Sequence, residues 1–136
     1  TKFIEVNVSG AKSKKDSRKI GMSIANSPLV KTAIAGEDPN WGRIIHAVGY
    51  SGASIREEFV DIYYESKAAC KGGLQAKTNP EVLRNIVSKP EFKITIDLGI
   101  GKANHRIYSP DLSPEYVDFN RSEYDYRKQA KKDGLV

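Results

Sequence analysis

The stretch Ser27–Ile44 carries two closely spaced helix starts, and this spacing limits the fold more than any other feature of the chain. Pro28 suits the first position of a helix, because the N–H that proline lacks would have no partner there. We expect Gly36 to end this helix in a left-handed conformation. Asp38 then caps a second helix, with Pro39 in its first position. The sequence therefore predicts two short helices joined by a tight polar turn.

The second of these helices has a single apolar face. Trp41, Ile44, Ile45 and Val48 recur at the i, i+3, i+4, i+7 spacing of one helix side, and Gly49 follows as a stop. We expect this face to lie on the core. The polar residues before the helix then sit at its positive dipole end, which suits an anionic substrate or a tight polar junction.

The remaining pattern mixes strands and helices. Strands are expected at 3–8, 59–65 and 92–98, where apolar and polar residues alternate, and shorter ones at 106–109 and 116–119; helices are expected at about 14–26 and from Pro80 to Lys89. Alternation argues against a parallel sheet buried on both faces. The predicted fold class is α/β (α+β), a two-layer sandwich with a mostly antiparallel mixed sheet and helices packed on one face.

Length and composition restrict the class of protein further. A chain of 136 residues makes one domain, which we place at 1–127, followed by a polar basic tail at 128–136 that is expected to fray. Cys70 is the only cysteine, which excludes an internal disulfide and suits a reducing, cytoplasmic location. The sequence shows neither a membrane-length apolar run nor a zinc-site spacing of Cys and His, so we expect no membrane contact and no metal.

The formal net charge of +5 is concentrated in two places. One group of cations falls on the expected helix 14–26, which also carries Asp16, and the other falls in the tail. We interpret the first group as a solvated helix face and expect no nucleic-acid partner. A basic RNA-binding domain stays as an alternative, and it predicts an affinity that falls steeply with salt. The two groups are Lys12, Lys14, Lys15, Arg18 and Lys19, and Arg127, Lys128, Lys131 and Lys132.

The segment SPLVKTAIAGEDPNWGRI resembles the signature of the ornithine acetyltransferase family, the bifunctional glutamate N-acetyltransferases of arginine biosynthesis. Four other segments resemble that family in the same order, up to about Tyr126. They are Thr1–Val6, Ile94–Gly101, Asp111–Ser113 and Tyr116–Asn120. The residues that carry the signature, here called the signature segment, are Gly36, Glu37, Asp38, Pro39, Asn40, Trp41, Gly42 and Arg43.

The resemblance implies an acetyltransferase that cleaves its own precursor just before a threonine. That threonine takes the acetyl group from N-acetylornithine, or in some members from acetyl-CoA, and passes it to glutamate, with no metal or prosthetic group. Thr1 does not match it, so the chain resembles the C-terminal part of the family's beta chain and is expected to hold no catalytic residue. The implied partners are the alpha chain and the remaining beta-chain segment, in a heterotetramer.

The resemblance also implies substrate-binding residues. Asn120 matches the asparagine of the family's Tyr-Val-x-x-Asn ending, although by itself it reads as a turn former. The hydroxyl residue that follows in the family falls here on Asp125 or Tyr126, so this sequence departs from the family's Ser or Thr at that position. Lys31 either reaches a ligand or lies on the surface of a short helix.

Several other residues carry less specific signals. Thr1 offers an alternative class, an N-terminal-nucleophile hydrolase with its own α-amine as base. His46 and His105 have no partners at triad spacing and are expected to be structural or exposed. Arg43 is expected to pair with Glu37 or Asp38. The adjacent acids Glu57 and Glu58 would face opposite sides of a strand, which is a poor arrangement for acid–base catalysis.

Overall fold

A computed structural model describes residues 2–135 of the chain. Its centre is one six-stranded sheet with the strand order β4-β3-β2-β5-β1-β6. The strands are β1 (Phe3–Ala11), β2 (Asp61–Tyr64), β3 (Lys67–Lys71), β4 (Leu74–Gln75), β5 (Glu91–Asp97) and β6 (Ala103–Pro110). β1 pairs in parallel with β5, and every other pairing is antiparallel. The expected mixed, mostly antiparallel sheet is therefore confirmed.

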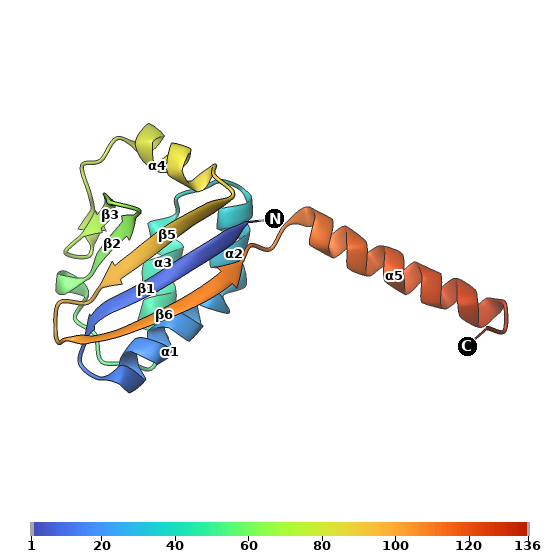
Figure 1. The fold of residues 1–136 in the computed structure, drawn as a ribbon, viewed down its shortest axis with the longest axis horizontal. Coiled ribbons are helices and arrows are strands. Elements are labelled where there is room, and N and C mark those ends of the chain that lie inside the picture. Colours follow the sequence, from blue (N-terminus) through green and yellow to red (C-terminus); the bar gives the residue numbers. More distant parts are fainter. Residues whose placement is uncertain (1, 136) are drawn as a thin grey trace.

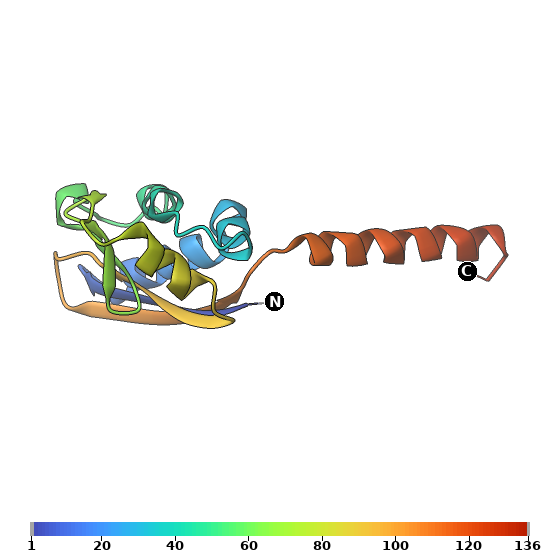
Figure 2. The same ribbon diagram turned by 90° about the horizontal axis from the view of Figure 1, so that it is seen from above.

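Four helices cover one face of this sheet, while no helix of the described chain covers the other face (Figure 1, Figure 2). They are α1 (Lys14–Ala25), α2 (Pro28–Ala35), α3 (Trp41–Gly49) and α4 (Pro80–Val87), and a short 3₁₀ turn, η1, spans Glu57–Phe59. The two-layer α/β arrangement predicted from the sequence is confirmed. No helix in the described range is long and apolar enough to cross a membrane.

The core forms where the alternating strands meet the helices. β1 and β5 lie in register, so that their inward residues, Ile4, Val6 and Val8 on one strand and Phe92, Ile94 and Ile96 on the other, are buried side by side. Val60, Ile62 and Tyr64 are buried in the same way around β2. The predicted apolar face of α3 also packs here, with Ile44 and Val48 buried and Trp41 and Ile45 partly buried against the core. The sheet is stable because its alternation leaves one complete apolar face for the helices.

The helix starts show one recurring device, a capping side chain followed by proline. The Ser27 hydroxyl accepts a hydrogen bond from Val30 N at 3.3 Å before Pro28, and the side-chain oxygen Asn79 Oδ1 accepts one from Glu81 N at 3.0 Å before Pro80. Such caps satisfy backbone donors that a helix leaves free in its first turn.

The junction between α2 and α3 differs from its prediction in two details. α3 begins at Trp41 with Asn40 as its cap, so Asp38 and Pro39 lie before the helix instead of starting it. Gly36 has an ordinary φ of −79°, and Glu37 takes the left-handed conformation with φ 55°. The helix therefore ends after Ala35 as predicted, but the left-handed residue is Glu37, one position after the expected glycine.

The C-terminal part of the chain departs most from the prediction. The strand expected at 116–119 is wrong, because this segment belongs to a long helix, α5 (Pro114–Lys132), which also includes the start of the expected frayed tail. Ser113 caps it and Pro114 occupies its first turn, so the Ser-Pro signal of α2 is repeated here. α5 projects from the body of the molecule (Figure 1, Figure 2).

Candidate functional site

The signature segment forms the tight connection between α2 and α3. Asp38 N donates to Ala33 O at 2.9 Å, and the Asn40 amide donates to Asp38 Oδ2 at 3.2 Å. The Asn40 side-chain oxygen in turn accepts from Arg43 N at 3.1 Å, which caps α3. The polar residues of the segment are thus used to fold the chain back on itself, which is the polar junction that the sequence offered as one possibility.

Arg43 holds α3 against α2 through a neutral partner. Its guanidinium donates to Leu29 O at 2.9 Å and approaches the Thr32 hydroxyl at 3.5 Å. The predicted ion pair with Glu37 or Asp38 is wrong, because the guanidinium points along α2 toward that helix's first turn. The Arg43 guanidinium therefore donates to a backbone carbonyl and a hydroxyl, and it needs no carboxylate partner for these hydrogen bonds.

Lys2 is a residue that the sequence did not single out, and it connects three separate segments. Its ammonium group donates to Val87 O at 2.8 Å and to Lys89 O at 3.0 Å, at the C-terminal end of α4. The same group lies 3.5 Å from Glu37 Oε1 in the signature segment, and its side chain is only 10% exposed. A cation at a helix C-terminus is favourable, because the carbonyl ends of the helix carry partial negative charge.

The main chain of Lys2 also fixes the entrance of α5. Lys2 N donates to Asp111 Oδ1 at 2.9 Å, and Asp111 N donates back to Lys2 O at 3.3 Å. The next residue, Leu112, donates its N–H to Lys31 O at 3.3 Å. The end of β6, the start of β1 and helix α2 are therefore tied together directly before α5 begins.

A cavity of about 600 Å³ opens at this junction, here called the Lys31 cavity. Its polar wall combines a cation with oxygen-bearing side chains, and its apolar wall comes from the first turns of α5. Hydrogen bonds from its own backbone N–H and from Ser113 hold the pKa of the Glu115 carboxyl below its ordinary value. The lining residues are Lys31, Pro110, Asp111, Leu112, Ser113, Glu115, Tyr116 and Phe119.

Only one of the predicted substrate-binding residues lines the Lys31 cavity. Lys31, half-buried on α2, lines the cavity, and Phe119 brings α5 to its edge. Asn120, Asp125 and Tyr126 lie exposed on α5 beyond it. Their contact with a substrate stays a prediction, as does that of Lys31.

Tyr64, at the end of β2, lies close enough to the signature segment for the charge of Asp38 to act on it. It is 2% exposed on β2. Burial, together with the negative charge of Asp38, raises the pKa of its phenol above the ordinary value.

The weaker candidates of the sequence take structural positions. His46 is exposed on α3, with its ring edge-on to Tyr50 at a centroid distance of 5.2 Å, and His105 is half-buried on β6. Glu57 and Glu58 lie in η1, where Glu58 pairs with Arg56 at 3.0 Å. Residues 2–135 contain no group of three or more His, Cys, Asp or Glu side chains that would hold a metal ion. Thr1 lies outside the described residues.

The fold and the site define an α+β domain in which the signature segment connects two short helices tightly and an open cavity lies nearby. The chain belongs to the ArgJ family, whose family model matches residues 1–127. The resemblance read from the signature segment is therefore confirmed.

Individual relatives agree with this assignment. The chain is 48% identical over 122 residues to the arginine biosynthesis bifunctional protein ArgJ of Chlorobaculum tepidum, covering 90% of this chain and 30% of that protein. It is 46% identical over 132 residues to the glutamate N-acetyltransferase of Methanocaldococcus jannaschii, covering 91% of this chain and 33% of that protein. The chain thus spans about a third of the length of these curated relatives.

A solved structure shares the fold. The crystal structure of the arginine biosynthesis bifunctional protein from Bacillus halodurans superposes with a TM-score of 0.86 at 36% sequence identity. The match covers 90% of this chain and 58% of that chain. The sheet and its covering helices are therefore those of an ArgJ-family protein.

Proposed function

We propose that this chain supplies one part of a glutamate N-acetyltransferase that moves an acetyl group from N-acetylornithine, or from acetyl-CoA, to glutamate. The observation that supports this most is the family match over 1–127, joined to relatives whose names give that activity. The acetyl group would be carried on a threonine that belongs to a segment other than this sequence, since the relatives are about three times as long.

Within this scheme the chain binds and positions substrate. Lys31 offers a cation to a carboxylate at the Lys31 cavity, and both amino-acid substrates carry carboxylates. The Asn120 amide donates and accepts hydrogen bonds, which suits an amino-acid head group. The nucleophile, its base and the donors that stabilise the oxyanion come from the partner segments, in a heterotetramer of cleaved chains in the cytoplasm.

Reconstitution tests the proposal. The chain is co-expressed with the preceding part of the Chlorobaculum tepidum relative, and transfer of an isotope-labelled acetyl group from N-acetylornithine to glutamate is followed by mass spectrometry. We expect transfer by the mixture and none by either part alone. An Asn120→Ala variant should lower turnover at least about tenfold, the loss expected when a substrate hydrogen bond is removed. Asn85→Ala, an exposed asparagine on α4, is the matched control and should leave transfer unchanged.

A folded mixed complex that transfers no acetyl group would contradict the proposal. Acylation of Thr1 by an activated ester in the chain alone would instead support the N-terminal-nucleophile hydrolase.

A further inference from the structure

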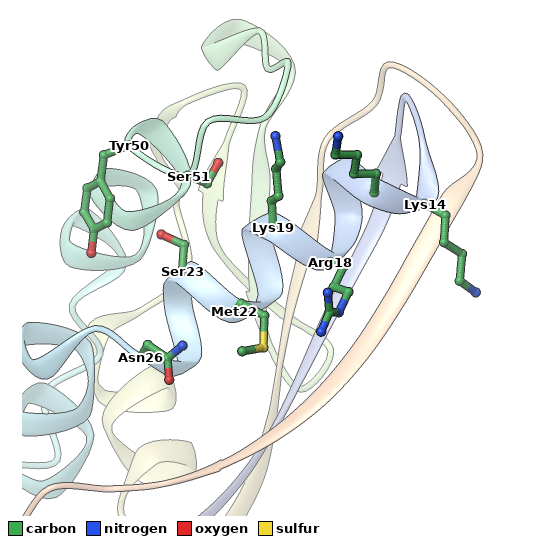
Figure 3. A pocket seen from close by; sticks show the side chains of 9 residues that line it. Lys14, Arg18, Lys19, Met22, Ser23, Asn26, Tyr50 and Ser51 are labelled. Atoms are coloured by element: carbon green, nitrogen blue, oxygen red, sulfur yellow. The ribbon is translucent and has the colours of Figure 1, made fainter.

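A second hollow, here called the basic groove, lies along the exposed side of α1 and reaches the end of α3 (Figure 3). Its volume is about 780 Å³, and it shares no lining residue with the Lys31 cavity. Figure 3 places Lys14 and Arg18 toward one end and Tyr50 at the other, with Met22 and Ser23 between them. The lining residues are Lys14, Lys15, Arg18, Lys19, Met22, Ser23, Asn26, Tyr50 and Ser51.

The cations of the groove lie on one side of α1 because of the helical repeat. Lys14 and Arg18 are one turn apart, and so are Lys15 and Lys19 in the adjacent row. All four side chains are exposed, and within residues 2–135 none of them pairs with a carboxylate. Like charges one turn apart destabilise a helix, so this face gains stability when an anion binds to it.

Two further features increase the positive potential of this face. The cations fall in the first half of α1, where the helix dipole is also positive. Asp16, the acidic residue of this helix, accepts a hydrogen bond from Ser54 N at 3.3 Å, which directs its carboxylate to the loop after α3. The field at the groove is therefore not neutralised by its own helix.

The other end of the groove is flat and apolar. Tyr50 is 57% exposed and Met22 is 36% exposed, while His46 supports the tyrosine ring edge-on. The Ser23 and Ser51 hydroxyls are already donated to Ala47 O and Val48 O, each at 2.7 Å. Tyr50 and Met22 both line the groove, and an exposed aromatic ring is a stacking platform for a planar group.

We propose that the basic groove binds a nucleoside polyphosphate, with its phosphates among Lys15, Arg18 and Lys19 and its base on Tyr50 and Met22. The volume falls in the range of small-ligand pockets. An RNA strand is disfavoured, because the second basic group, at the C-terminal end of α5, lies far from α1 on the projecting helix (Figure 1). Binding here does not depend on acetyl transfer.

Calorimetric titration of the 136-residue chain with ADP, pyrophosphate and adenosine tests this proposal. We expect saturable binding of ADP that weakens as salt rises. Lys15→Gln with Lys19→Gln should weaken ADP and pyrophosphate binding at least about tenfold, since each lost charge-assisted hydrogen bond counts strongly. Tyr50→Ala should weaken ADP binding about tenfold through lost stacking and leave pyrophosphate binding unchanged. All substituted positions are exposed, and circular dichroism verifies that each variant is folded.

The matched control carries Lys131→Gln with Lys132→Gln, the same charge change at the end of α5, and should bind ADP within about twofold of the parent chain. An equal loss in this control would overturn the proposal, as would the absence of ADP binding. Tighter binding of an RNA oligonucleotide, dependent on both basic groups, would also overturn it.

Discussion

Lys2 and Asp111 lie 109 positions apart and hold each other by two hydrogen bonds, one from Lys2 N to Asp111 Oδ1 at 2.9 Å and one from Asp111 N to Lys2 O at 3.3 Å. Because the Lys2 ammonium group also contacts Glu37 and the end of α4, one residue connects the signature segment to the entrance of α5. The Lys31 cavity opens beside this connection, so its shape depends on a contact that no local pattern encodes.

Replacing Lys2 by methionine should lower the free energy of unfolding by roughly 2 kcal/mol, because carbonyls of Val87 and Lys89 lose a charged donor while the alkyl stem is kept. Denaturant titration measures the change. Lys77→Met, on an exposed loop, is the control and should stay within about 0.5 kcal/mol of the parent. Equal effects of the two substitutions would show that the Lys2 contacts carry no stability.

Asn40→Ala should destabilise the chain by about 1 kcal/mol, because Arg43 N loses its capping acceptor at the start of α3. Asn40→Ser keeps a capping acceptor oxygen without placing a second carboxylate beside Asp38, and should retain most of the stability. Thermal or urea unfolding of both variants checks the cap. If the Ser and Ala variants unfold alike, the capping bond is not what stabilises this position.

Most of the fold was predictable because it is encoded locally. The alternation in 92–98 and the 3.6-residue spacing in α3 each need only neighbouring residues to be read. The prediction of a strand at 116–119 was wrong because Tyr, Val and Phe in close succession favour a strand. The Ser113–Pro114 cap favours a helix instead, and the segment is helical in the structure. The hairpin strand β3 escaped notice because Ala68, Ala69 and Cys70 carry little strand preference, and its pairing with β2 supplies the order.

The site was predictable only where a motif marks it. The signature segment and Lys31 could be found in the sequence, and the structure places Lys31 at a cavity. The role of Lys2 depends on contacts between distant segments, so spacing gives no signal for it. Alternation places Tyr64 on the same side of the strand at 59–65 as Val60 and Ile62, but it does not show that Asp38 lies near. The partner of Arg43 was misjudged for a related reason, since charge alone favoured Glu37 while the geometry of α2 presents the Leu29 carbonyl.

Gly73→Ala should lower the free energy of unfolding by about 2 kcal/mol or more. Its φ is 76°, and an added Cβ would lie 2.6 Å from Glu57 O, so both backbone strain and a steric clash follow. Gly49→Ala is the matched control, because nothing lies within 4 Å of its added Cβ and it ends a helix, where alanine is preferred. Chemical denaturation should therefore show a large loss of unfolding free energy for Gly73→Ala and a small loss or a gain for Gly49→Ala. A Gly73→Ala variant as stable as the parent chain would contradict the tight turn.

Asp61 should make the free energy of unfolding depend on pH in the acidic range. Partial burial alone would raise the pKa of its carboxyl, but hydrogen bonds from Gly72 N and the Lys71 ammonium group at 2.8 and 2.9 Å outweigh burial and lower it. A carboxyl whose folded pKa is lowered contributes stability above its unfolded pKa, about 3.9, and loses that contribution as pH falls through the folded value. Asp61→Asn should thus destabilise the chain near pH 7, and its effect should shrink as the pH falls below the unfolded pKa of about 3.9. Urea midpoints of the parent chain and the Asp61→Asn variant, measured across this pH range, give the difference in stability, and Asp118→Asn on α5 is the control. A difference in stability that does not change with pH would contradict the hydrogen bonds of Asp61 to Gly72 and Lys71.

In the reconstituted acetyltransferase, Lys31→Gln should raise KM for glutamate about tenfold and change kcat little. The reason is that a cation at the Lys31 cavity would bind a carboxylate equally in the ground state and the transition state, and such uniform binding appears in KM. Lys31→Arg keeps the charge and should recover much of the affinity, whereas Lys128→Gln removes a charge from α5 and should alter neither constant. Steady-state kinetics of the three variants distinguish this role from a purely structural one, which would lower the amount of folded complex without moving KM. A fall in kcat per folded complex at unchanged KM, with the amount of complex measured separately, would instead place Lys31 among the residues that act on the reacting atoms.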